Sequence, residues 1–251
     1  MQMGSVKIGK KGAERTARSG NKYRMPEKLD HFLITTMQRG LDENFIPDHD
    51  LMNKIKESAK NGGRAKLNRA GEIVELPIRL LYNDIDLNFP TRYAAYEGKK
   101  CVCSGDGEVA VRNGQEKPCP CDWLQADAKG FAKCKPNGAL TCILEESEYL
   151  GGCHRFHTTS YNTVVSMLGS LALIQTATRG RLAGIPLNLV LSPKTVSLPT
   201  GGNSTIHVVS AIYKGSVNDL QAKAIEYARE DATYHKQIEM VETYARQEAA
   251  H

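Results

Sequence analysis

The chain has 251 residues, enough for one large domain or two small ones with a substantial buried core. Lys and Arg number 33 and Asp and Glu 28, so the formal charge is only +5. No apolar run reaches about 18 residues and the first residues are polar, so we expect neither a membrane span nor secretion. Seven crowded Cys residues favour metal binding or free thiols over a disulfide framework, as in a cytoplasmic protein.

The basic residues are concentrated at the start of the chain. Residues 1–28 hold eight Lys or Arg and two Asp or Glu, which leaves the remainder close to neutral. Residues 1–24 show almost no apolar periodicity, so we predict a basic flexible arm there. Such an arm suits phosphate backbones, although a mobile surface tail explains it equally well. The candidate nucleic-acid-binding residues are Lys7, Lys10, Lys11, Arg15, Arg18 and Lys22, with Lys99, Lys100 and Lys117 as a second cationic patch.

An α+β core is predicted over residues 25–98 and 137–215. In its first part, β-branched and aromatic content predicts a strand over residues 28–36. Asp48 can cap a short helix over residues 51–58. A further strand is predicted over residues 75–82, and its proline places it at a sheet edge or strand start.

The second part of the core alternates strands with one helix. Strands are predicted over residues 139–144 and 152–159. Residues 162–178 predict a helix with Ser160 as its N-cap, and this helix is apolar on all sides, so we expect it to be buried. The predicted strands over residues 185–191 and 206–213 plausibly form a hairpin.

Residues 216–251 predict a long exposed helix that begins at Ser216. Its apolar positions are sparse, so it would pack on a partner or project from the body, with a homo-oligomer as one option. The predicted fold class is therefore α+β, with a mixed or antiparallel sheet, a buried helix, a four-cysteine zinc-binding insert and this C-terminal helix.

The insert, residues 99–136, replaces the aliphatic pattern with Gly, Pro and Cys. Four of its cysteines, Cys103, Cys119, Cys121 and Cys134, follow the spacing Cys-x15-Cys-x-Cys-x12-Cys. Thiolates are soft ligands, and four of them form a closed structural zinc site. Because the insert has few large apolar residues, a structural metal is a reasonable means of holding it together. Zinc is therefore the expected cofactor.

Other cysteines compete for a place in this ligand set. Cys101 is an alternative to Cys103, which we prefer because a tight turn follows it. Cys142 lies in an apolar strand and is better explained as a small buried side chain. Cys153 and His157 share a strand face and could chelate a second metal, although ordinary packing is the simpler explanation.

Catalytic signals are weak. Asp84 and Asp86 would point the same way from a strand, as in a magnesium-dependent nuclease, but solvated acids at a strand end are more common. Ser160 near His157 has no nucleophile elbow and no orienting carboxylate. No phosphate-binding loop with a Gly-Lys-Ser/Thr signature is present. These observations favour binding over catalysis.

Several phrases together resemble one protein family. They are KIGKKG from Lys7, PEKLDHF from Pro26, CSGDG from Cys103, Cys119-Pro120-Cys121, CKP from Cys134, FHTTSYN from Phe156 and LAGIPL from Leu182. This set, over roughly residues 5–213, resembles the phage and prophage recombination directionality factors of large serine integrases. The family is often labelled a hydrolase or metal-binding protein.

The resemblance implies a mobile-element protein of a bacterial host cell that switches an integrase between insertion and excision. It also implies Cys103, Cys119, Cys121 and Cys134 as zinc ligands, and DNA or a DNA-bound integrase as partner. A single-strand-binding or transcription factor, with Tyr93, Tyr96 or Trp123 stacking on bases, is an alternative. A protein-only interaction module and a metal-dependent nuclease are the others.

Overall fold

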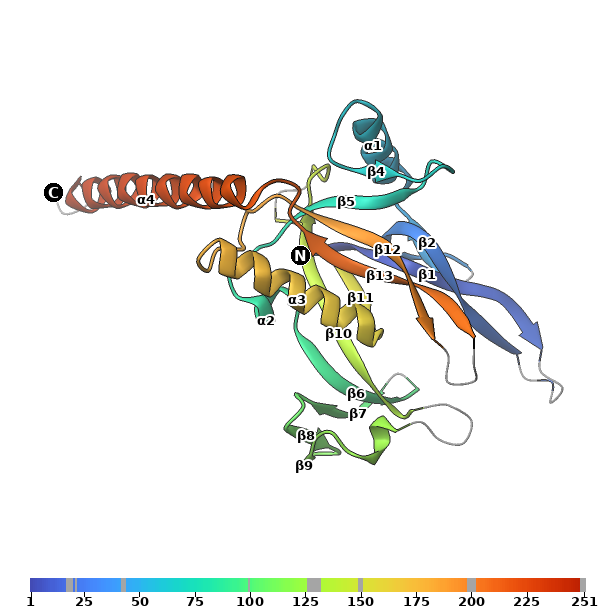
Figure 1. The fold of residues 1–251 in the computed structure, drawn as a ribbon. Helices are drawn as coiled ribbons and strands as arrows, with labels where there is room; N and C mark the ends of the chain where they lie inside the picture. The colour runs from blue at the N-terminus through green and yellow to red at the C-terminus, as the bar shows by residue number, and fades with distance from the viewer. Residues whose placement is uncertain are drawn as a thin grey trace.

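The structure is a computed structural model that describes residues 1–16, 20, 22–41, 44–98, 100–125, 132–148, 151–197 and 202–248. Over these residues the fold is mixed α+β and mostly sheet, with four α-helices (Figure 1). The last is the long helix α4 (Val217–Glu248), which extends away from the body. The predicted α+β class with a long C-terminal helix is confirmed.

The strands follow one main path with a branch. The path runs β3 (Phe45–Pro47), β2 (Lys22–Arg39), β1 (Gln2–Thr16), β11 (Cys153–Thr158), β10 (Cys134–Leu144), β6 (Thr91–Glu97), β7 (Lys100–Gly105), β8 (Val109–Arg112) and β9 (Gln115–Pro118). Only β1 and β11 are parallel on this path, so the sheet is mixed.

The branch begins at the end of β10. Residues 138–142 of β10 pair with β11, whereas residues 143–144 pair with β5 (Ile73–Arg79). β5 also pairs with β4 (Lys66–Leu67) and with β12 (Leu187–Ser197), which forms an antiparallel hairpin with β13 (Asn203–Ile212). The predicted hairpin is confirmed over the described residues.

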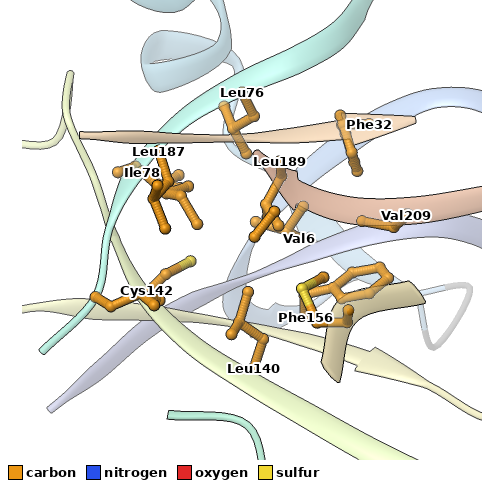
Figure 2. Packing of buried hydrophobic residues seen from close by; sticks show 14 of the residues in the cluster. Val6, Phe32, Leu76, Ile78, Leu140, Cys142, Phe156, Leu187, Leu189 and Val209 are labelled. Carbon is orange, nitrogen blue, oxygen red and sulfur yellow. The ribbon is translucent and has the colours of Figure 1, made fainter. Parts of the chain in front are cut away.

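The main core lies between these two groups of strands. Figure 2 shows Ile78, Leu187 and Leu189 from the branch facing Leu140 and Phe156 from the main path. These five side chains are completely buried. Burial of a side chain of this size contributes about 1.5–3 kcal/mol relative to its exposure, so this interface holds the two groups together.

Local capping signals in the sequence predict two helices correctly. In α1 (His49–Lys60) the Asp48 carboxylate accepts a hydrogen bond from the Leu51 amide at 3.1 Å. In α3 (Tyr161–Ala177) the Ser160 hydroxyl accepts one from the Thr163 amide at 3.4 Å. Both bonds satisfy amides that have no partner within the helix.

Helix α3 is not buried on all sides, which corrects the prediction from its composition. Met167 and Leu171 are fully buried, and the Thr163 hydroxyl accepts a hydrogen bond from the Val209 amide of β13. Val165 and Leu173 are 50% and 74% exposed on the other side. Figure 1 shows the reason, because α3 covers the strands from outside.

The basic N-terminal segment is a strand, and the predicted flexible arm is wrong for residues 2–16. β1 pairs along its length with β2, and its first residues also pair with β11. Val6 is only 1% exposed. Burial against other strands therefore offsets the conformational entropy that is lost when this segment becomes ordered, which the segment could not do in isolation. Residues 17–19 and 21 of the predicted arm lie outside the described residues.

β5 is not an edge strand, contrary to the expectation from Pro77. Pro77 lies opposite Asn188 of β12 on one side. On the other side, pairing with β4 ends at Glu75 and pairing with β10 starts at Ile78. Because Pro77 falls between these two neighbours, its missing N–H interrupts neither ladder.

The start of α4 is attached to the body. Leu220 and Ala224 are buried, and Arg181 forms an ion pair of 2.7 Å with Asp231. The described side chains after Asp231 are exposed. No helix in the described part of the chain is both long and apolar enough to cross a membrane.

Candidate metal centre and nucleic-acid interface

The four cysteines of the predicted ligand set surround one cavity of about 10 Å³. Cys103 lies in β7, Cys119 follows β9, Cys121 precedes the 3-10 helix η1 (Asp122–Leu124), and Cys134 begins β10. Cys103 and Cys134 are buried and the other two are half-buried. A space of this size holds about one atom or water molecule.

Close packing around the cavity depends on Gly105. A Cβ atom at this position would lie 2.9 Å from Cys119 Sγ and 2.7 Å from the Ala110 Cβ. Real Cβ atoms do not approach so closely, so a side chain here would displace Cys119 or β8. Gly105 therefore sets the distance between β7 and the Cys119 thiol.

Cys101 lies apart from this group. It is exposed, does not line the cavity, and its thiol donates to the Cys103 carbonyl at 3.4 Å. The structure thus places Cys103, and not Cys101, beside the other three cysteines.

A cation accompanies the thiols. Arg112 Nη2 donates to Cys121 Sγ at 2.9 Å, and its guanidinium lies 3.7 Å from the Trp123 ring centroid. Burial raises the pKa of Cys134, and negative charge on Cys103, Cys119 and Cys121 would raise it further. Several thiolates are therefore not stable together here unless a cation compensates them.

Four thiol donors are the ligand type that zinc prefers, but their arrangement here is not that of a metal site. Among the described residues, no group of three or more His, Cys, Asp or Glu side chains meets the geometry of an ion-binding site. What is present is an atom-sized cavity lined by four soft ligands, with Arg112 positioned to offset the negative charge of a four-thiolate zinc centre. The metal itself stays a prediction.

The remaining cysteines do not join this site. Cys142 is completely buried, and burial raises its pKa to about 12, so it acts as a packing residue. The Cys153 thiol is 3.5 Å from the Met1 carbonyl, and His157 lines a different pocket. The two do not form an ion-binding group within the described residues.

Three predicted basic residues line one groove of about 410 Å³ on β1, β2 and the β3 region. We call it the basic groove and define it by its cations Lys7, Lys10, Lys11, Arg24, Lys28 and Arg39. Glu27 is its one acidic lining residue and pairs with Lys10 at 3.4 Å, with both side chains about half exposed. An exposed pair of this kind is weak, so the groove keeps a positive potential.

The other predicted basic residues lie elsewhere. Lys22 pairs with Glu14 at 2.8 Å, and Arg15 contacts the Met25 sulfur at 3.7 Å. Lys100 and Lys117 are exposed on β7 and β9. Arg18 and Lys99 lie outside the described residues.

Sequence reasoning missed Arg24, Lys28 and Arg39 as members of the groove. The signal was available in part, because β2 was predicted over residues 28–36. What was missing was the pairing of β1 with β2, which places Lys28 opposite Gly9. This pairing brings the cations of residues 7–11 together with those of residues 24–39, which are separate in the sequence.

The two acids of the nuclease hypothesis have structural roles. Asp84 is the N-cap of helix α2 (Ile85–Asn88), and one carboxylate oxygen accepts from the Asp86 and Leu87 amides at 2.7 and 3.1 Å. Asp86 lies in the first helical turn and not on a strand. The expectation that both carboxylates point the same way from a strand is therefore wrong.

The aromatic residues considered for base stacking lie on β6 and beside the cysteine cavity. Tyr93 and Trp123 line the cysteine cavity. Tyr96 is 53% exposed, and its hydroxyl accepts from Asn137 Nδ2 at 3.3 Å. Packing accounts for the first two rings.

Comparison with protein-family models identifies a family. A family model named Gp3-like, described as recombination directionality factor-like, matches residues 3–214. No curated protein and no solved structure matches the chain. The matched region contains the cysteine cavity and the basic groove, and it ends before α4.

Proposed function

The chain belongs to the recombination directionality factor-like family, and from this membership we propose that it controls a phage integrase by binding DNA, the DNA-bound integrase, or both. The family itself suggests a phage recombination-related role. We further propose that the protein is stabilised by zinc and that its role is binding and not catalysis.

The basic groove is the observation that carries DNA binding. Its six cations come from two long paired strands, β1 and β2, with one carboxylate among the lining residues. Lys and Arg side chains along an extended ribbon can neutralise successive phosphates of a nucleic-acid backbone. Such contacts position a protein on DNA without reading its sequence.

The cysteine module has a structural role in this proposal. Cys103, Cys119, Cys121 and Cys134 would hold the zinc, and four protein ligands leave no position for substrate. The metal would supply the cohesion of β7, β8 and β9, whose small cluster contains few large apolar side chains.

A second candidate is a protein-only module that binds its partner through α4. The observation in its favour is that the described side chains of α4 after Asp231 contact water and lie beyond the family match. A long helix with one end anchored can present a surface to another protein.

A salt series tests the DNA proposal. We expect wild-type protein to bind duplex DNA with an affinity that falls steeply with salt, and the Lys10→Gln/Lys11→Gln variant to lower the slope by about 2, roughly one per lost phosphate contact. Arg69→Gln, which removes an exposed cation elsewhere, is the matched control. The same salt series on single-stranded DNA distinguishes a recombination factor, which should prefer duplex DNA, from a single-strand-binding protein.

Two results would contradict the proposal in different ways. An unchanged slope in the double variant removes the basic groove from the DNA interface. Absence of DNA binding, together with salt-independent capture of purified integrase that is lost when residues 235–251 are deleted, favours the protein-only module.

A further inference from the structure

A pocket of about 710 Å³ lies where strands β1 and β11 separate. The two strands pair only as far as Val6, opposite Phe156, after which β1 continues with β2 alone. Ile206 and His207 of β13 also line the pocket, from a hairpin that runs beside the β1–β2 ribbon (Figure 1). The volume is within the range of about 300–1,000 Å³ found for small-molecule sites.

The lining of this pocket is cationic. Lys7, Lys28 and Arg155 line it, and no acidic residue does. The side chains of Lys28 and Arg155 form no ion pair or hydrogen bond with the residues that the structure describes. Cations left without a carboxylate in a concave site attract an anion.

One histidine of the pocket, His157, reports the same potential. Burial lowers the pKa of His157, and the charges of Arg155 and Lys7 lower it further. Asp30 does not line the pocket, and its carboxylate lies 2.8 Å from His31 Nδ1. The positive charge around His157 therefore has no counter-charge within the pocket lining.

Apolar groups and hydroxyls complete the lining. Met37, Phe45 and Ile206 provide apolar surface, and the Lys7 ammonium lies 4.0 Å from the Phe45 ring centroid. Thr159 and Ser160 line the pocket just before α3, whose N-terminus carries a partial positive charge. An anionic group joined to a flat apolar body matches this combination, and a nucleotide has both.

We propose that this pocket binds one nucleotide, with its phosphate at Lys28 and Arg155 and its base against Met37, Phe45 and Ile206. Lys7, Gly9, Lys28 and Phe45 line both this pocket and the basic groove, so the two surfaces are continuous. The inference rests on the proposed function. It adds that one unpaired nucleotide of the bound nucleic acid occupies this pocket. A free nucleotide has the same chemistry.

The test measures binding of thymidine 5′-monophosphate, thymidine, inorganic phosphate and a four-residue oligothymidylate to the full chain by calorimetry. We expect the monophosphate to bind more tightly than either thymidine or phosphate alone. Arg155→Gln and Lys28→Gln should each weaken it about tenfold, since a hydrogen bond to a charged group is lost. Arg69→Gln is the matched control, and circular dichroism verifies that each variant is folded.

The outcomes separate this proposal from the proposed function. If the oligonucleotide binds more tightly than the monophosphate and this depends on Arg155, the natural ligand is a nucleic-acid strand. If the monophosphate binds more tightly, the natural ligand is a free nucleotide. The nucleotide-pocket proposal is overturned if both folded variants bind the monophosphate with unchanged affinity. It is also overturned if phosphate and the monophosphate bind equally well. Arg155 does not line the basic groove, so loss of the pocket leaves the Lys10 and Lys11 test on duplex DNA intact.

Discussion

Cys103 and Cys134 lie on opposite sides of strand β6, and each is the register partner of the same residue, Ala95. They are 31 positions apart in the sequence, and β6 precedes both of them. The two thiols reach one cavity because β7 and β10 pair with the two edges of β6. This pairing joins the cysteine module to the main sheet.

The first prediction concerns metal content. We expect purified protein to hold about one zinc per chain and the Cys103→Ser variant to lose it, because a closed site needs all four ligands. Cys101→Ser should keep the metal, since Cys101 lies outside the cavity. Elemental analysis with thermal unfolding measures both. Zinc loss from Cys101→Ser with retention in Cys103→Ser would reverse the assignment.

The second prediction compares two glycines. Gly105→Ala should destabilise the protein by about 1–3 kcal/mol, because its Cβ would lie 2.9 Å from Cys119 Sγ. Gly169→Ala should stabilise it by about 1 kcal/mol, since Gly169 is in α3 with nothing within 4 Å of an added Cβ. Chemical denaturation measures both. Equal effects of the two changes would contradict the packing described around Gly105.

The third prediction concerns thiol reactivity. Iodoacetamide should label Cys101 in the native protein, because it is exposed. Cys142 should stay unlabelled at pH 8, since burial raises its pKa to about 12 and leaves almost no thiolate. Peptide mass spectrometry gives the labelled positions, and the guanidinium-unfolded chain is the control. Early labelling of Cys142 would show that its strand opens readily.

The fourth prediction is a loss of stability in acid. His154 is 2% exposed, and burial lowers its pKa below the ordinary 6.5. The unfolded chain therefore takes up a proton at a higher pH than the folded chain does. The contribution of neutral His154 to the free energy of unfolding should be fully present above about pH 6.5. It should decrease as the pH falls from there to the folded-state pKa.

Two measurements check this behaviour of His154. Unfolding midpoints across the pH range should show the decline, and His154→Gln should reduce its steepness. NMR titration of the His154 ring measures the pKa directly. A ring that titrates at or above 6.5 would exclude His154 as the cause.

The fifth prediction separates the two parts of α4. Deletion of residues 235–251 should leave the unfolding temperature nearly unchanged, because the side chains described in this range, residues 235–237 and 240, are exposed. Deletion of residues 217–251 should cost about 2 kcal/mol or more, since it exposes the site of Leu220 and breaks the Arg181–Asp231 pair. Differential scanning calorimetry compares them. Equal losses would mean that the distal part also packs on the body.

Local signals in the sequence determined much of the secondary structure. Asp48 and Ser160 begin α1 and α3 as predicted, because a cap requires only a side-chain oxygen and an amide three residues away. The β12–β13 hairpin has the same local character. The cysteine spacing likewise selected the four residues that line the cavity, and the family phrases were recognised from the sequence alone.

Pairing between distant segments was decided only by the tertiary structure. The N-terminal segment is polar and basic, yet Val6 is buried because β2 and β11 lie on either side of it. The same pairing formed the basic groove and the pocket at Arg155, and neither is visible in any local window of sequence. A local hydrophobic pattern could not predict the burial of this segment, because one of the strands that cover it is distant in the sequence. Here β2 and the distant strand β11 supply this burial, so the location of the charges depended on the fold.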